Sequence, residues 1–137
     1  MDKMPLLQIK GLTKTFTLEK GLFSKGGAVR AVDDVSFDVE QGECLAIVGE
    51  SGCGKTTLCR MILRLLEPDK GKIIFEGEDF WKARGNKLKE LRRKIQPIFQ
   101  DPFGSLNPRF TMARLISEGL FVHGITQRKE IARLSVT

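Results

Sequence analysis

One stretch of eight residues constrains the fold of this chain more than any other part of its sequence. It reads Gly-Glu-Ser-Gly-Cys-Gly-Lys-Thr from Gly49 to Thr56 and fits the pattern G-x-x-x-x-G-K-T. The pattern has a structural meaning when a buried strand precedes it and a helix follows it. Here the apolar run Cys44–Val48 precedes it, and apolar residues recur at helical spacing from Leu58 onward. The sequence therefore predicts a strand, a loop and a helix within an α/β fold.

The fixed residues of this motif each have a task at a phosphate group. Glycines at positions 49 and 54 let the main chain approach the phosphates, so that successive N–H groups form an anion nest. A helix that begins near Lys55 adds its positive dipole end, and the Lys55 ammonium adds a full charge. The Thr56 hydroxyl suits Mg²⁺. We therefore expect this loop to bind Mg-ATP through Gly49, Glu50, Ser51, Gly52, Cys53, Gly54, Lys55, Thr56 and Thr57. The alternative is a chance match in a glycine-rich turn, which the flanking pattern disfavours.

The remaining pattern predicts short strands and helices. One or two short strands broken at Gly11 are expected over residues 7–16, a loop over 20–28 and a half-buried strand over 35–39, followed by a turn at 41–43. The helix after the motif should end before Pro68, with Arg60 and Arg64 on its polar side, and a turn should follow at 69–71. Further strands are expected at 73–75 and 95–99, a basic helix or loop around residues 87–94, and a last helix over 112–120 with Thr111 as its cap.

Composition limits the other functions that the chain could have. Its 137 residues suit one small domain, and the net charge of +6 favours anionic partners. Three cysteines and one histidine are too few and too scattered for a structural zinc site, and they suggest no disulfide framework, so a reducing compartment fits best. No apolar run approaches the roughly 20 residues that span a bilayer.

Two sequence blocks together resemble a known family. The variant GESGCGKTT, preceded by GECLAIV, is similar to the nucleotide-binding subunits of ABC transporters. A second block, IFQDPFGSLNPR at residues 98–109, resembles the Q-loop of the oligopeptide, dipeptide and nickel importers, and its SLNPR ending is characteristic of that subgroup. The openings LQIKGLTKTF and AVDDVSFDVEQGE match the same family's N-terminal sheet. The resemblance covers nearly the whole chain and fades towards its end.

The resemblance implies a P-loop NTPase fold of the ABC ATPase type. Residues 1–137 would be the N-terminal portion of the nucleotide-binding domain: an antiparallel β subdomain, the first part of the RecA-like core and the start of the helical subdomain. Lys55 and Gln100 would be the catalytic residues, with Gln100 contacting Mg²⁺ or the attacking water and coupling the site to a transmembrane partner. Phe16 would stack on adenine, although it could equally be a core residue of the N-terminal sheet.

Several elements of the family pattern do not occur in these residues. There is no LSGGQ-type signature and no apolar strand ending in Asp-Glu after it, and His123 precedes the place of the family's switch histidine. The acids in IIFEGED, residues 73–79, lie before the Q-loop block, and Gly77 suggests a turn there. We therefore expect the chain to stop partway into the helical subdomain, and we predict that it cannot turn over ATP alone.

The implied function is that of the ATP-hydrolysing subunit of an importer for peptides or nickel. Its partners would be transmembrane permease subunits, a second ATP-binding subunit and, indirectly, a periplasmic or extracellular substrate-binding protein. It would lie in the cytoplasm against the inner face of the membrane. The alternatives are a small P-loop kinase, a nucleotide-binding fragment without turnover, and an ABC protein of nucleic-acid metabolism. The basic run 82–94 is expected to be a solvated face, and no aromatic platform accompanies it, so no nucleic acid is expected.

Overall fold

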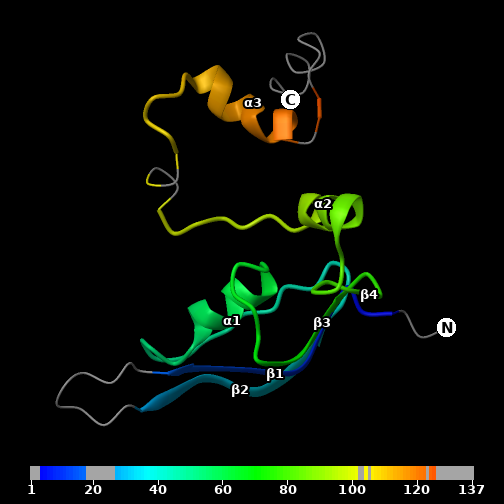
Figure 1. The fold of residues 1–137 in the computed structure, drawn as a ribbon, viewed down its shortest axis with the longest axis vertical. Helices are drawn as coiled ribbons and strands as arrows, with labels where there is room; N and C mark the ends of the chain where they lie inside the picture. Colours follow the sequence, from blue (N-terminus) through cyan, green and yellow to red (C-terminus); the bar gives the residue numbers. More distant parts are fainter. Residues whose placement is uncertain (1–3, 18–26, 102–103, 105, 123, 126–137) are drawn as a thin grey trace. The chain divides into compact units, whose positions relative to one another are not determined.

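The computed structural model describes residues 4–17, 27–101, 104, 106–122 and 124–125. The chain divides into two compact units, Met1–Ile95 and Gln96–Thr137. The first unit is built on a four-stranded antiparallel sheet of order β2-β1-β3-β4 (Figure 1). These strands are β1 (Leu7–Thr17), β2 (Ala28–Val39), β3 (Lys70–Phe75) and β4 (Glu78–Asp79). The sheet is the antiparallel N-terminal part that the sequence predicts.

Strand β1 is a single element, so the predicted break at Gly11 is wrong. Gly11 instead marks an irregularity, because the register of β1 against β2 shifts between Ile9 and Leu12. Its φ is +60°, and its N–H donates to the Ser36 hydroxyl at 2.8 Å. A glycine therefore bends the strand without ending it. The predicted loop over residues 20–28 lies mostly outside the described residues, and Ala28 already begins β2.

The alternating pattern of β2 is confirmed. Val35, Phe37 and Val39 are half-buried, and Ser36 and Asp38 between them are exposed. The buried side of the sheet joins the first helix in one hydrophobic core, which consists of Ile9, Leu12, Val32, Leu58, Met61, Ile73, Phe75, Phe80 and Leu91. The core thus holds the helix that follows the motif against the sheet.

Helix α1 (Lys55–Ile62) is shorter than predicted. The chain turns at residues 63–64, where Arg64 takes a left-handed φ of +56°, and the turn predicted at 69–71 is already the start of β3. Asp69 fixes that start, because its carboxylate accepts hydrogen bonds of 2.7 Å from the Lys14 ammonium and from the Thr15 N–H. These bonds, the Lys14 bond first, lower the pKa of Asp69.

The expected helices beyond the sheet are present. Helix α2 (Gly85–Lys94) forms where the basic helix or loop was expected and buries Leu91. In the second unit, helix α3 (Met112–Val122) follows Thr111, whose hydroxyl accepts from the Arg114 N–H at 3.3 Å, so the predicted cap is confirmed. Among the described residues, no helix is long and apolar enough to cross a bilayer.

Two predicted strands are absent from the described structure. Residues 44–48 form no strand, and Leu45, Ile47 and Val48 are 45%, 39% and 87% exposed. Residues 95–99 also form no strand, and Ile98 is 97% exposed. A strand that is buried on both faces needs hydrogen-bonded neighbours. The sheet formed by the described residues places no strand beside either run, so neither has a ladder to join.

Candidate nucleotide-binding site

Two glycines of the phosphate loop lie so close to the atoms beside them that an added side chain would clash. Gly54 has φ +99°, and a Cβ placed there would lie 2.0 Å from the carbonyl oxygen of Ala31 in β2. A Cβ at Gly49 would lie 2.6 Å from the Cys53 sulfur. Packing therefore requires glycine at position 54, where the close atom belongs to the backbone, whereas at position 49 the close atom belongs to a cysteine side chain, which can rotate away. Ala31, which the motif does not reveal, forms the wall against which the loop turns.

The Lys55 ammonium lies inside the curve of this loop. It donates to the carbonyl oxygens of Gly49 and Glu50 at 2.7 Å each and lies 3.4 Å from the Cys53 sulfur. These partners are neutral, and within the described residues no carboxylate forms an ion pair with Lys55. Its positive charge is thus held at the loop without being neutralised, which is the arrangement that an anionic ligand needs.

The N-terminus of α1 adds to this positive site. The helix is capped by Gly54 without a side-chain hydrogen bond, and its first turn contains no acidic residue. A hollow of about 140 Å³ lies there, lined by Ala31, Gly52, Gly54, Lys55, Thr56 and Thr57. The N-terminus of α1 and residue Lys55 therefore border one small space, which suits an anion at a helix N-terminus.

The donor set fits a magnesium ion only if the nucleotide shares it. Among the described residues, no group of three or more histidine, cysteine, aspartate or glutamate side chains could hold a metal. The Thr56 side chain is exposed on the wall of the hollow and offers a single hydroxyl oxygen. Mg²⁺ commonly takes one or two protein ligands and fills its shell with phosphate oxygens and water. The residues present are therefore compatible with Mg²⁺ that arrives with the nucleotide.

Phe16 is not a core residue. It lies near the end of β1 opposite Val29, its side chain is 40% exposed, and the Lys14 ammonium lies 5.9 Å from the ring centroid. The sequence allowed Phe16 to be either a core residue or a ring that stacks on adenine, and this exposed position does not fit a core residue. An exposed ring flanked by a cation suits a base, and stacking on adenine stays a prediction.

Gln100 belongs to the second unit and is exposed. The Q-loop block around it is partly described: the Asp101 carboxylate accepts from the Gly104 N–H at 2.9 Å, and the Asn107 side chain accepts from the Arg109 N–H at 3.0 Å. The second bond belongs to the turn that the Asn107-Pro108 pair predicts. Residues 102, 103, 105 and 123, the last of these His123, lie outside the described residues.

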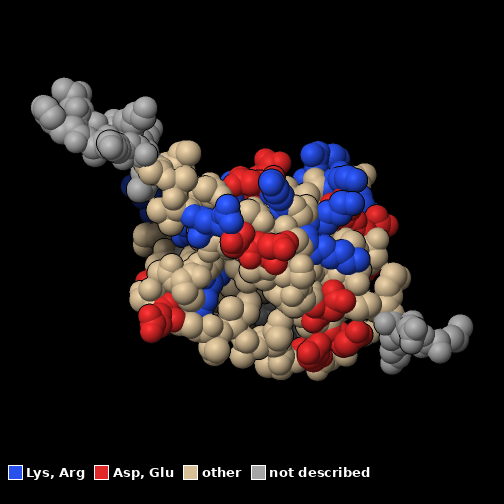
Figure 2. Space-filling model, turned by 90° about the horizontal axis from the view of Figure 1, so that it is seen from below, with Lys and Arg blue, Asp and Glu red and all other residues tan. Residues whose placement is uncertain are grey.

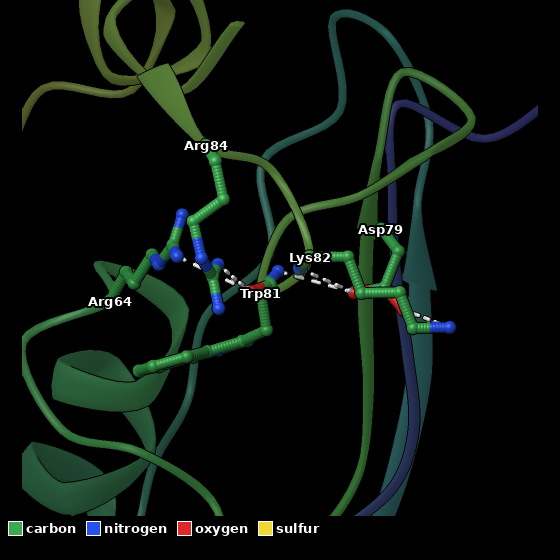
Figure 3. Close-up of polar contacts among 5 residues, drawn as sticks. All are labelled: Arg64, Asp79, Trp81, Lys82 and Arg84. Carbon is green, nitrogen blue, oxygen red and sulfur yellow. Dashed lines mark hydrogen bonds and ion pairs between the residues drawn. The ribbon is translucent and has the colours of Figure 1, made fainter.

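The prediction that Arg64 lies on the polar side of a longer helix is wrong. Its guanidinium turns inward and donates to the carbonyl oxygens of Phe80, Ala83 and Trp81 at 2.9, 3.0 and 3.2 Å. It also lies 5.2 Å from the centroid of the Trp81 ring. Figure 3 shows the Arg64 and Arg84 side chains meeting beside Trp81. Burial lowers the pKa of Arg64, and the nearby charge of Arg84 lowers it further.

This cluster explains why α1 ends early. An arginine in the left-handed region costs backbone energy, and here three carbonyl contacts and a ring contact offset that cost. Asp79 orders the same segment, since its carboxylate accepts from the Trp81 N–H at 3.1 Å and from the Lys82 N–H at 3.3 Å (Figure 3). The spacing of residues in the sequence does not predict this arrangement, because Arg64 lies at a helical spacing from Arg60 and yet falls outside α1. The cluster ties the end of α1 to the start of α2.

The fold and the loop define this chain as a P-loop nucleotide-binding protein, and comparison with known proteins gives its family. Residues 32–137 match the family model described as ABC transporter. An oligopeptide transport ATP-binding protein of Bacillus subtilis is 48% identical over 126 residues, which are 91% of this chain and 39% of that protein. A probable peptide ABC transporter ATP-binding protein of Sinorhizobium fredii is 49% identical over 82% of this chain and 32% of its own length.

Solved structures agree with this assignment. An ATP-binding cassette solved as a dimer in a post-hydrolysis state, bound to ADP and Pi, matches with a TM-score of 0.73 and 25% identity over 95% of this chain and 54% of its own. This chain belongs to the ABC transporter family and has the fold of its ATP-binding cassettes. It spans less than two fifths of the length of the two curated relatives.

Proposed function

We propose that this chain supplies the nucleotide-binding loop of the ATP-binding subunit of an ABC importer for peptides. The observation that carries the proposal is the Lys55 ammonium inside the loop at the N-terminus of α1, where no carboxylate of the described residues pairs with it. The peptide cargo rests on the names of the relatives, which are peptide and oligopeptide transport proteins. Nickel is the alternative cargo that the Q-loop block suggests.

The loop residues act on the nucleotide by electrostatics and position. Main-chain N–H groups of residues 49–56 and the first turn of α1 would receive the phosphates. Lys55 would exchange its two carbonyl partners for phosphate oxygens, which are stronger acceptors because they are charged. Thr56 would hold Mg²⁺ together with the nucleotide, and the ion would neutralise charge between the β- and γ-phosphates. Phe16 would contact the base.

Hydrolysis needs more groups than these residues provide. ABC ATPases as a family hydrolyse ATP, and Gln100 is the residue that we assign to the ion or the attacking water. The sequence contains no apolar run that ends in Asp-Glu and no LSGGQ-type signature to complete the shell around the γ-phosphate. We expect a polypeptide of these residues alone to bind ATP and to release no phosphate above background. Sustained release that disappears in Lys55→Ala would contradict this.

The partners follow from the same family. We propose that the subunit pairs with a second ATP-binding subunit and attaches, at the inner face of the cell membrane, to permease subunits that receive cargo from a substrate-binding protein. The Q-loop block 98–109 is the segment that we assign to the permease contact. The turn at residues 107–110 carries its own hydrogen bonds, from the Arg109 N–H to the Asn107 side chain and from the Phe110 N–H to the Asn107 carbonyl oxygen.

The test is calorimetric titration of Mg-ATP into the protein and its Lys55→Ala variant. Loss of one charge-assisted contact should weaken binding by about 1.5–3 kcal/mol. Lys72→Ala is the matched control, because Lys72 is an exposed lysine on β3, outside the loop. Equal affinity of Lys55→Ala and the parent protein would overturn the assignment.

A further inference from the structure

One segment carries the whole net charge of this protein. Residues 82–94 contain seven lysines and arginines and one glutamate, a net charge of +6, and the net charge of the entire chain is also +6. Basic and acidic residues cancel over the rest of the chain. On the face drawn in Figure 2, lysine and arginine side chains lie next to aspartate and glutamate side chains. The net positive charge therefore falls on one short segment, of which α2 carries five cations and one glutamate.

The fold fixes this segment as a rigid exposed face. Helix α2 packs its apolar side into the core through Leu91, which is 1% exposed, and through Leu88 and Ile95 beside it. The cationic side chains of the segment are exposed: Lys82, Arg84, Lys87, Lys89, Arg92, Arg93 and Lys94. Because the helix is anchored by its apolar side, its charged side presents a constant surface to a partner.

Acidic neighbours compensate only part of this charge. Lys87 pairs with Glu78 at 3.6 Å and with Glu90 at 3.9 Å, and Lys94 pairs with Glu76 and Glu90. Within the described residues, Lys89 and Arg93 form no ion pair. At helical spacing, residues 89 and 93 are four apart and share one side of α2.

The neighbouring arginines add to the positive potential. Arg84 uses its guanidinium on the neutral carbonyl oxygens of Trp81 and Ala83, so its charge stays uncompensated. The pKa of Arg64 is lowered by burial first and then by the charges of Arg84 and Arg92, while Glu67 and Asp79 raise it, so charges of both signs lie near Arg64. Favourable interaction with the dipole at the end of α2 accounts for basic residues in its last turn. It does not account for Arg84 or Lys89, whereas Lys82 pairs with Asp79 at 3.5 Å.

We propose that residues 82–94, here called the basic face, bind the anionic headgroups of the membrane against which the subunit works. The proposal rests on the proposed function, which places the chain at the inner face of a membrane. The cytoplasmic leaflet carries a negative surface potential that attracts clusters of four to eight lysines and arginines. A nucleic acid fits less well, because α2 contains no aromatic side chain and the ring of Trp81 is covered by Arg64.

The contact with the membrane is electrostatic, and no part of α2 inserts into the bilayer. The apolar residues of α2 are occupied in the core, so no hydrophobic side remains to enter the bilayer. Binding should therefore vanish at high salt, where the screening length falls to about 3 Å. It should also require anionic lipid. Such a contact would orient the subunit on the membrane surface beside its permease without adding a second hydrophobic interface.

The experiment is sedimentation of the protein, purified as the cell makes it, with lipid vesicles. Vesicles of phosphatidylglycerol mixed with phosphatidylcholine are compared with vesicles of phosphatidylcholine alone, at low and at high salt. The test variant is Lys89→Glu with Arg93→Glu. Each cation near a membrane surface contributes about a fivefold effect on binding, so partitioning should fall by at least about 25-fold.

Two controls separate a local effect from a general one. Lys10→Glu with Lys72→Glu makes the same change of net charge at two exposed lysines that face each other across β1 and β3. Lys89→Arg with Arg93→Lys keeps the charge and should bind as the parent does. Equal loss in both charge-reversed variants, or equal binding to neutral vesicles, would overturn the proposal. Binding of duplex or single-stranded DNA in place of anionic vesicles would overturn it in favour of a nucleic acid.

Titration with Mg-ATP keeps this test independent of the proposed nucleotide site. The Lys89→Glu, Arg93→Glu variant should bind Mg-ATP as the parent does, because neither residue lines the hollow at the phosphate loop. Loss of vesicle binding with intact nucleotide binding supports the basic face. Vesicle binding that is unchanged in this variant refutes the basic face and leaves the nucleotide assignment standing.

Discussion

The phosphate loop with α1 and the apolar run 44–48 before it are adjacent, but they depend on different interactions for their conformation. The loop is polar and glycine-rich, yet it has a defined conformation, because its contacts lie within a few residues or on the neighbouring strand β2. The run is wholly apolar, yet its Val48 is 87% exposed and it joins no strand of the described sheet. Hydrogen bonds between nearby residues can fix the conformation of a segment, whereas an apolar segment is buried only if other segments cover it.

The largest effect should come from the closest contact in the loop. Gly54→Ala places a Cβ 2.0 Å from the Ala31 carbonyl oxygen at a φ of +99°. We expect it to abolish ATP binding and to lower the free energy of unfolding by about 3 kcal/mol or more, the range of severe core and strain defects. Chemical denaturation and calorimetry measure both quantities.

Gly42 is a control that separates the cost of a left-handed backbone from the cost of a steric clash. Gly42 has φ +85°, and a Cβ there would meet nothing within 4 Å. Gly42→Ala should therefore cost only the left-handed backbone energy, about 1–2 kcal/mol, and should leave ATP binding intact. If the two variants were equally stable, the packing of the loop against β2 would not be what fixes it.

A smaller effect is expected at the adenine position. Phe16→Ala should weaken ATP binding by about 1–3 kcal/mol if the ring stacks on the base. Inorganic triphosphate should bind the variant and the parent protein equally, because it has no base. Val29→Ala on the opposite strand is the control for damage to the sheet. Equal weakening of ATP and triphosphate would make Phe16 a structural residue.

These contrasts also explain which sequence predictions succeeded. The start of α1 and the cap at Thr111 were predictable because each depends on residues a few positions apart. The phosphate loop was recognisable from its own eight residues, but its packing on Ala31 was not. The alternation in β2 was predictable for the same reason. The strands expected at 44–48 and 95–99 were not, because an apolar run specifies only that it should be buried and not what will bury it.

Arg64 and Asp69 show a second limit of sequence reasoning. Both make long-range polar contacts, Arg64 to carbonyls of residues 80–83 and Asp69 to Lys14 and Thr15. Such contacts follow from the folded arrangement and leave no period in the sequence. They decide where α1 ends and where β3 begins, so the predicted boundaries there were wrong while the elements themselves were right.

Asp69 gives a modest, pH-dependent effect. Hydrogen bonds from Lys14 and Thr15 lower its pKa below the ordinary 3.8, so its contribution is present above that value and is lost as the pH falls through its lower folded-state pKa. Asp69→Asn should therefore be less stable than the parent at neutral pH, and the difference should shrink in acid. Denaturant titrations between neutral and strongly acidic pH measure it. A difference that stays constant with pH would show that charge is not involved.

The smallest effect is expected at Val48, in the apolar run 44–48, and it tests the contrast between this run and the packed parts of the fold. Val48→Thr and Val32→Thr make the same change, but Val48 is 87% exposed and Val32 is 5% exposed. In a polypeptide of these residues, Val48→Thr should alter the free energy of unfolding by less than about 0.5 kcal/mol, as surface changes do. Val32→Thr buries a hydroxyl among the core side chains and should cost about 1–3 kcal/mol. Within any longer polypeptide that contains these residues, the same pair of variants tests whether residues 44–48 become covered. Equal losses at both positions there would show that Val48 is buried by chain outside these residues, and the predicted strand would form once its neighbours are supplied.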